Sequence, residues 1–190
     1  MQTNIIIAGV GGQGTLLASK IIGAAALLKG YDVKVSESHG MSQRGGSVTT
    51  YVRYSDKKVY SPVVTSGADT ILSFELLEGY RMTPLLKRGG LLITSTQTID
   101  PIPVITGEAV YPENLRDKLA AASIGAVLID AFSLAVNAGS PKCANVVLIG
   151  ALAARFTDIA KSDWLAALRS SIPPRLLEIN QKAFESGFAT

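Results

Sequence analysis

Short apolar segments of strand length alternate along the chain with longer segments that show helical spacing. Residues 4–8, 70–74, 91–94 and 126–130 are the strand-like segments, and such runs are typical of strands buried on both faces of a sheet. Strands that alternate with helices fold as layers around one sheet. The pattern therefore predicts an α/β protein, a three-layer α/β/α sandwich with a Rossmann-like, mostly parallel sheet, formed as a single domain by residues 1–190.

Start and stop signals place the helices between these strands. Gly30 ends the first helix, Pro84 bends or ends the second, and Ser140 followed by Pro141 is the N-cap pattern that opens a later one. Residues 99–104 contain two prolines, which predicts an irregular or edge-like segment. The helices are expected at residues 15–28, 75–87, 112–121, 132–138, 142–156, 162–169 and 173–186.

The middle of the chain predicts antiparallel pairing inside the sheet. Residues 31–36 form the expected second strand. Residues 47–54 alternate in polarity, as a half-buried strand does, and a polar turn at 55–58 leads into another apolar run at 59–64. This pattern predicts a β-hairpin of residues 47–54 with residues 59–64, and hence a mixed sheet.

A glycine-rich loop follows the first strand. Gly9-Val10-Gly11-Gly12-Gln13-Gly14 fits G-x-G-x-x-G between a strand and a helix, the context in which this motif binds a phosphate at the helix N-terminus. The acid of a dinucleotide site is expected about 20 residues further on, and Glu37 lies 23 residues after Gly14. The alternative is that the glycines only let the helix and strand pack closely. The candidate ligand-binding residues of this loop are Gly9, Gly11, Gly12, Gln13 and Gly14.

A polar loop at residues 36–47 has no hydrophobic period and contains the only histidine of the sequence, His39. A histidine suits proton transfer near neutral pH, and the planar guanidinium of Arg44 suits a carboxylate or phosphate. His39 and Arg44 are therefore candidate catalytic residues, and Glu37 and Gln43 join them as candidate ligand-binding residues. The alternative is that these side chains only hydrogen-bond one another and the loop backbone. One histidine without a second histidine or a cysteine nearby is an inadequate ligand set, so no metal site is expected.

Composition limits the class of protein. Hydrophobic residues make up 47% of the chain and charged residues 17%, which fits either a thick α/β core or a surface partly buried against other subunits. The net charge of +3 comes without a basic block, so nucleic-acid binding is not expected. The single cysteine, Cys143, excludes an internal disulfide, a four-cysteine iron–sulfur cluster and a cysteine-rich zinc site, and it is expected to be buried.

Neither a secretory signal nor a membrane span is expected. The first predicted strand begins at Asn4, and no charged segment or cleavage pattern precedes it. The longest apolar run, residues 146–154, is far shorter than the ~20 residues that span a bilayer. These features predict a soluble, cytoplasmic protein.

The two polar loops together carry a resemblance to a known family. GVGGQG at residues 9–14 and SESHGMSQRGGSV at 36–48 resemble the gamma subunit of 2-oxoacid:ferredoxin (acceptor) oxidoreductases, most of all the indolepyruvate oxidoreductase small-subunit type. The HGMSQRGG stretch is the specific element, because many families share the glycine motif. Further matches are Tyr60-Ser61-Pro62, Gly67-Ala68-Asp69, Phe74-Glu75 with Glu78, Lys87-Arg88-Gly89-Gly90, Tyr111-Pro112, Asn145 with Gly150-Ala151-Leu152, and Asn180 with Ala183-Phe184 and Gly187.

The resemblance implies a subunit of a heteromeric enzyme. That enzyme decarboxylates a 2-oxoacid oxidatively, transfers the acyl group to coenzyme A and passes electrons to ferredoxin. Thiamine diphosphate, Mg²⁺ and 4Fe–4S clusters would lie on partner subunits, because this chain has one cysteine and no Gly-Asp-Gly segment followed by an asparagine for a thiamine diphosphate site. Here the glycine and polar loops would contact coenzyme A or the partner's active site. Two alternatives stay open: a stand-alone NAD(P)-binding oxidoreductase of Rossmann type, and a scaffolding subunit whose polar loop is only an interface.

Overall fold

The computed structural model describes residues 1–38, 46–122 and 124–190. Within these residues six strands form one sheet in the order β2-β3-β1-β4-β5-β6. The strands are β1 (Gln2–Val10), β2 (Asp32–Ser38), β3 (Ser47–Ser55), β4 (Ala68–Ser73), β5 (Leu86–Ser95) and β6 (Gly125–Ile129). The helices are α1 (Thr15–Leu28), α2 (Leu76–Met82), α3 (Ile102–Ile105), α4 (Leu115–Ala121), α5 (Ala131–Ala138), α6 (Ala144–Ala153), α7 (Lys161–Ser171) and α8 (Pro174–Phe188), with 3₁₀ turns η1 (Thr83–Leu85) and η2 (Pro141–Cys143).

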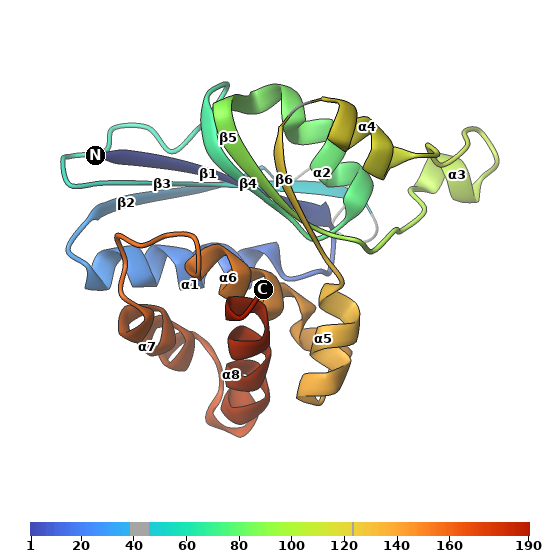
Figure 1. Ribbon diagram of the computed structural model, residues 1–190. Coiled ribbons are helices and arrows are strands. Elements are labelled where there is room, and N and C mark those ends of the chain that lie inside the picture. The colour runs from blue at the N-terminus through green and yellow to red at the C-terminus, as the bar shows by residue number, and fades with distance from the viewer. Residues whose placement is uncertain (39–45, 123) are drawn as a thin grey trace.

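Helices cover both faces of the sheet (Figure 1). Helices α1, α5, α6, α7 and α8 lie on one face, and α2 and α4 lie on the other. Two clusters of buried apolar side chains fill the spaces between these layers. Ile5 and Ile7 of β1 belong to the cluster that α1 and α6 cover, whereas Ile6 belongs to the one beneath α2 and α4. The expected α/β/α sandwich with a mixed, mostly parallel sheet is confirmed.

The antiparallel part of the sheet differs from the expected hairpin. β3 pairs antiparallel with β1 on one side and with β2 on the other, and Val52 stands opposite both Ile5 and Val35. Residues 59–64, the predicted second strand of the hairpin, form no strand, so that prediction is wrong. Both edges of β3 are already occupied, and side chains hold this segment instead: the Asp32 carboxylate accepts its first backbone N–H at 2.7 Å.

Prolines set the end of α2, one of the two outcomes predicted for Pro84, and the start of α3, which was not predicted. The helix expected at residues 75–87 ends at Met82, because Pro84 offers no N–H to the helical ladder and the chain passes through η1 into β5. β5 consequently starts at Leu86, earlier than expected. The proline-containing segment at 99–104 runs into the single turn of α3.

Helix α6 is the buried centre of the helical layer. It is apolar on all sides, and its residues from Asn145 to Ala153 are buried. Helix α8 crosses it at two glycines. A Cβ added to Gly150 would lie 2.1 Å from the Phe184 carbonyl oxygen, and one added to Gly187 would lie 1.8 Å from the Val147 carbonyl oxygen. Glycine at both positions therefore lets the two backbones approach closely.

Cys143 lies at the end of η2 and is 5% exposed, as expected. Burial raises the pKa of its thiol, which keeps the side chain protonated and lets it pack as a small apolar group. In the part of the chain that the structure describes, no helix combines the length and apolar character that crossing a membrane requires.

Gly187→Ala should lower the free energy of unfolding by about 3 kcal/mol or more, because the methyl group would overlap the Val147 backbone and force α6 and α8 apart. Gly23→Ala in α1 is the matched control. Its Cβ would meet the nearest atoms at 3.6 Å, an ordinary contact, so helix propensity should leave stability unchanged or raise it by up to about 1 kcal/mol. Urea unfolding followed by circular dichroism measures both, and equal stability of the two variants would contradict the close crossing.

Candidate ligand-binding site

A pocket lies at the carboxyl ends of the parallel strands. β1 continues into α1 on one face of the sheet, whereas its neighbour β4 continues into α2 on the other. Ligands of open α/β sheets bind where neighbouring strands diverge in this way. The pocket has a volume of about 360 Å³, and its lining residues are Gly12, Gln13, Phe74, Ser95, Gln97, Ile99, Phe132, Pro141, Lys142, Ala144, Asn145 and Leu148.

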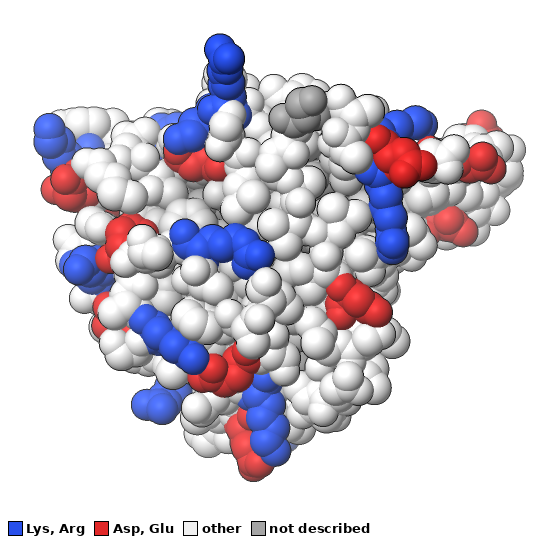
Figure 2. Space-filling view, viewed as in Figure 1, with Lys and Arg blue, Asp and Glu red and all other residues white. Residues whose placement is uncertain are grey.

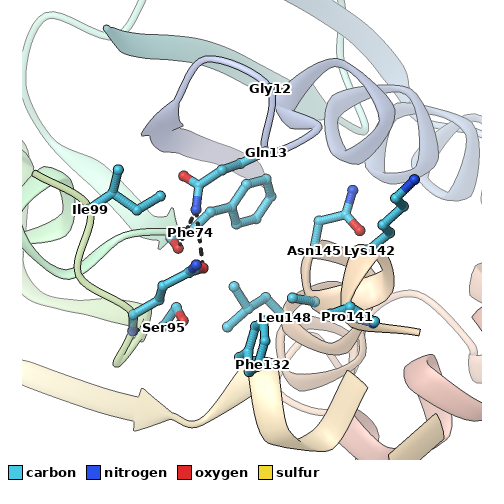
Figure 3. A pocket seen from close by; sticks show the side chains of 12 residues that line it. Gly12, Gln13, Phe74, Ser95, Ile99, Phe132, Pro141, Lys142, Asn145 and Leu148 are labelled. Atoms are coloured by element: carbon cyan, nitrogen blue, oxygen red, sulfur yellow. Dashed lines mark hydrogen bonds between the residues drawn. The ribbon is translucent and has the colours of Figure 1, made fainter. Parts of the chain in front are cut away.

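Gln13 fixes the shape of the glycine loop. Its Oε1 accepts a hydrogen bond from the Val10 N–H at 2.7 Å, and its Nε2 donates to the Phe74 carbonyl oxygen at 3.0 Å and to Gln97 Oε1 at 3.4 Å. The amide thus joins the end of β1 to the end of β4 (Figure 3). Gly9 leaves room for it, since a Cβ there would lie 2.9 Å from Gln13 Oε1. The loop is therefore ordered before any ligand arrives, which lowers the entropic cost of binding.

The first turn of α1 has neither a capping side chain nor an acidic side chain to balance the positive end of the helix dipole. Its N-cap, Gly14, adopts a left-handed conformation with φ 85° and offers no side chain to the free N–H groups of the first turn. That turn also contains no acidic residue. Free N–H groups and the helix dipole together favour an anion at this point.

Asn145 and Lys142 face this helix end from across the pocket. Figure 3 shows their amide and amino groups directed toward the first turn of α1. Asn145 is 8% exposed; its Oδ1 accepts the Val146 N–H at 2.9 Å, and among the described residues its Nδ2 makes no hydrogen bond. A Cβ on Gly14 would lie only 2.4 Å from that nitrogen. A buried amide donor and an ammonium group beside free backbone N–H groups suit a phosphate.

The remaining walls of the pocket are neutral and largely apolar. Phe74, Ile99, Phe132 and Leu148 supply apolar surface, and Ser95 and Gln97 supply small polar groups. None of the described lining residues is acidic. The pocket therefore combines an end that attracts an anion with walls that fit the less polar part of a larger ligand.

A buried carboxylate supports the pocket from the side of α2. Glu75 is 1% exposed and is the N-cap of α2: its Oε2 accepts the Glu78 N–H at 2.7 Å. Its Oε1 accepts the Ile99 N–H at 3.2 Å and the Tyr111 hydroxyl at 2.5 Å. Burial, together with the hydrogen bond to Glu75, raises the pKa of Tyr111, so its hydroxyl stays a donor. Glu75 thus fixes the position of Ile99 at the pocket wall.

The end of the polar loop lies beside the glycine loop. Glu78 Oε2 accepts a hydrogen bond from Ser47 Oγ at 2.5 Å. The Gly46 carbonyl oxygen accepts the Gly11 N–H at 2.9 Å. Residues 39–45 lie outside the described part of the chain, and the roles predicted for the three candidates there, His39, Gln43 and Arg44, stay predictions.

The other predicted site residues lie in two places. Gly12 and Gln13 line the pocket, and the remaining predicted glycines belong to the same loop. Glu37 is on β2, which β3 separates from β1, so it lies two strands from the glycine loop and outside the pocket lining. In a dinucleotide-binding half the second strand lies directly beside the first. The structure therefore does not bring Glu37 to the glycine loop in the way that a ribose-binding acid requires.

The pocket residues from the second half of the chain were not selected from the sequence. Asn145 does carry a signal: it is the single polar side chain in the run of residues 144–153, and a buried amide needs hydrogen-bond partners. Lys142 carries none, because a lysine at the start of a helix is usually solvated. Only the fold, which brings η2 and α6 against the glycine loop, shows that the two belong together.

The chain matches the sequence family described as Pyruvate ferredoxin/flavodoxin oxidoreductase over residues 4–190. Indolepyruvate oxidoreductase subunit IorB of Thermococcus kodakarensis is 44% identical to it over 191 residues, which cover 98% of this chain and 94% of that protein. The similarity therefore includes both loops and the helical C-terminal part.

Solved structures share the fold. The gamma subunit of keto/oxoacid ferredoxin oxidoreductase from Geobacter sulfurreducens aligns with a TM-score of 0.74 at 25% identity, over 98% of this chain and 96% of that one. The 2-oxoglutarate:ferredoxin oxidoreductase from Magnetococcus marinus, solved with 2-oxoglutarate, coenzyme A and succinyl-CoA bound, aligns with a TM-score of 0.77 at 23% identity, over 99% of this chain and 30% of that one. The latter likeness concerns the fold alone.

Gln13→Glu should keep the hydrogen bond from the Val10 N–H and lose the one to the Phe74 carbonyl oxygen. At about pH 8 we expect a loss of roughly 1–3 kcal/mol in the free energy of unfolding, the cost of leaving a buried polar group unsatisfied. A protonated carboxyl can donate to that carbonyl, so the difference from wild type should shrink as the pH falls to about 5. Urea unfolding across this pH range measures it.

Gln97→Glu is the matched control, because it adds the same charge to the same pocket while keeping the oxygen that accepts from Gln13. Gln97→Glu should lower the free energy of unfolding by less than Gln13→Glu does, because it removes no donor to the Phe74 carbonyl oxygen. Equal losses in the two variants at every pH would contradict the bridging role of Gln13.

Proposed function

The chain belongs to the pyruvate ferredoxin/flavodoxin oxidoreductase family, as a gamma-type subunit of the 2-oxoacid:ferredoxin oxidoreductases, and from this we propose that residues 1–190 act as one gamma-type domain within a larger complex. In the proposed reaction a 2-oxoacid, coenzyme A and two oxidised ferredoxins give an acyl-CoA thioester, carbon dioxide, a proton and two reduced ferredoxins. The isolated chain would be inactive.

Partner subunits hold the redox and decarboxylation centres in this proposal. Cys143 is the only cysteine of the sequence and is buried, so this chain cannot supply four thiolates to an iron–sulfur cluster. The sequence also has no Gly-Asp-Gly segment followed by an asparagine, the pattern of a thiamine diphosphate site. Thiamine diphosphate, Mg²⁺ and 4Fe–4S clusters, bound on the partners, would supply decarboxylation and electron transfer. Ferredoxin would meet the complex at the subunit that carries the clusters.

We assign the pocket beside α1 to coenzyme A. The observation that carries this assignment is the uncapped first turn of α1 facing the unpaired amide of Asn145 and the ammonium group of Lys142. The phosphate groups of coenzyme A match these donors, and its pantetheine arm suits the apolar walls. Further support is that the Magnetococcus marinus enzyme, which shares the fold, was solved with coenzyme A bound.

Each part of the site has a role in this proposal. The loop from Gly11 to Gly14 and the first turn of α1 would lie under a phosphate, with the N–H groups of Gly12 and Gly14 as the loop donors, because Gly11 and Gln13 already donate theirs to backbone carbonyls. Gln13 would hold the loop in shape, and Lys142 and Asn145 would complete the anion site. The polar loop, through Glu37, His39, Gln43 and Arg44, would face coenzyme A or the partner's active site. Support for its place is the Gly11 to Gly46 hydrogen bond, which returns the polar loop to the glycine loop.

A stand-alone NAD(P)-binding oxidoreductase has less support. A nucleotide-binding half continues from its second strand into a crossover helix and then a parallel strand. Here β2 is followed by the antiparallel β3, which lies between β2 and β1 and separates Glu37 from the glycine loop. The family assignment also favours the complex.

The substrate of the complex should be an aryl pyruvate. The support is the 44% identity to the IorB subunit over nearly the whole chain. We expect the chain, tagged in its native host, to co-purify with thiamine-diphosphate-binding and ferredoxin-like, cluster-containing subunits. The purified complex should reduce ferredoxin faster with indolepyruvate than with pyruvate or 2-oxoglutarate. Purification of this chain alone as a complete catalyst would refute the assignment to a complex, and a preference for 2-oxoglutarate would refute the aryl substrate alone.

Asn145→Ala should raise the KM of the complex for coenzyme A by about 10-fold or more, the value of one hydrogen bond to a charged group. The KM for the 2-oxoacid should stay unchanged, because the pocket does not bind that substrate. Asn137→Ala on α5, which is exposed and outside the pocket, is the control and should change neither value. Steady-state kinetics with each substrate varied in turn distinguishes these outcomes. An unchanged KM for coenzyme A in Asn145→Ala would remove this pocket as its site.

A further inference from the structure

Residues 99–111 form an arm that projects from the body of the protein and exposes apolar side chains. The arm contains α3 and extends to the right in Figure 1, away from the sheet and the other helices. Ile102 is 53% exposed, Ile105 73% and Val110 84%. Exposed aliphatic side chains gathered on one projection are typical of surfaces that contact another protein.

The arm is ordered, although little of it is buried. The Ala109 N–H donates to the Pro103 carbonyl oxygen at 2.9 Å and brings the returning side of the arm against α3. At the base, Glu75 Oε1 accepts both the Ile99 N–H and the Tyr111 hydroxyl, so one buried carboxylate binds the first and the last residue of the arm. This arrangement fixes the direction of the arm without burying its apolar tip, and a preorganised segment binds at a lower entropic cost.

The charge on the arm is of one sign. Between Arg88 and Arg116 the sequence contains no lysine, arginine or histidine; the arm itself contains Asp100 and Glu108, and Glu113 follows two residues after its end. Figure 2 shows acidic residues on the projection at the right. An apolar tip flanked by carboxylates complements an apolar groove with lysine or arginine at its rim.

We propose that this arm is a docking element that inserts Ile102, Ile105 and Val110 into an apolar groove with a basic rim on a partner subunit. The proposal rests on the proposed function, in which this chain works inside a complex. The base of the arm adjoins the pocket: Ile99, the first residue of the arm, lines it, and so does Gln97, two residues earlier. In the proposed function the thiol of coenzyme A bound in that pocket reaches the partner's reaction centre, and a pantetheine arm that follows the wall at Ile99 would bring the partner beside the arm. Because the arm lies beside the pocket, we infer that it contacts a partner subunit and not a second copy of this chain.

Reconstitution of the complex from separated subunits tests the proposal. The affinity of the full chain for the partner subunits is measured by fluorescence anisotropy, for wild type, for Ile105→Asp with Val110→Asp, and for Glu108→Lys. The matched control is Leu28→Asp, at an exposed leucine (56%) near the end of α1, on the far side of the molecule from the arm. All these side chains are exposed, so thermal unfolding should confirm that each variant folds as wild type does.

The double variant should bind the partner roughly 100-fold or more weakly, as expected when two central apolar contacts are lost. Glu108→Lys should bind more weakly than wild type, by a factor that decreases as salt is added. Leu28→Asp should bind as wild type does. Equal affinity of the double variant and wild type would overturn the arm proposal and leave the proposed function standing. Self-association of the chain that the double variant abolishes would also overturn it, in favour of a second copy. A wild-type chain that binds no partner at all would overturn both proposals.

Discussion

The side-chain amide of Gln13 is the interaction on which the site depends. Its oxygen holds the backbone at the end of β1 and its nitrogen holds the backbone at the end of β4, so two neighbouring parallel strands and the loop between β1 and α1 become one rigid edge. With the loop fixed in this way, Gly12 and Gly14 keep N–H groups that bond to no other described residue, and α1 begins without a side-chain cap. Helix α6 supplies the opposite side of the site. Its close crossing with α8 at Gly150 and Gly187 fixes its position among the helices, and in that position Asn145 lies next to Gly14. The anion site is thus a consequence of backbone packing and needs few charged side chains.

Two buried carboxylates connect this site to its surroundings. Glu75 caps α2 and binds both ends of the arm at residues 99–111, while Glu78 binds Ser47 at the start of β3. Burying a carboxylate is costly unless hydrogen bonds satisfy it, and here Glu75 accepts from three donors and Glu78 from two, Ser47 and Arg81. Both carboxylates belong to the start of the same short helix, Glu75 as its N-cap and Glu78 in its first turn. The pocket, the arm and the returning end of the polar loop are therefore held relative to one another by one element.

Local patterns in the sequence specify the layers of this fold but only half of its site. The apolar runs and the helical periods place the strands and helices, and the glycine motif places Gly12 and Gln13 at the pocket. The hairpin of residues 47–54 with 59–64 was wrong because sheet order is decided by which strand edges are free, and β1 and β2 occupy both edges of β3. The spacing rule that selected Glu37 holds only where the first and second strands are neighbours in the sheet. Here β3 lies between β1 and β2, so the rule does not apply. Asn145 and Lys142 lie more than a hundred residues from the glycine loop, so only tertiary packing brings them to it.

Hydrogen–deuterium exchange of the assembled complex, with and without coenzyme A, tests the central claim most directly. The claim is that a gamma-type subunit binds the phosphate end of coenzyme A with the backbone at the start of α1. The account predicts slower exchange on addition of coenzyme A in peptides that cover residues 9–17 and 141–148, and unchanged exchange in α7. Protection confined to the partner subunits, in a complex that turns over coenzyme A, would contradict it.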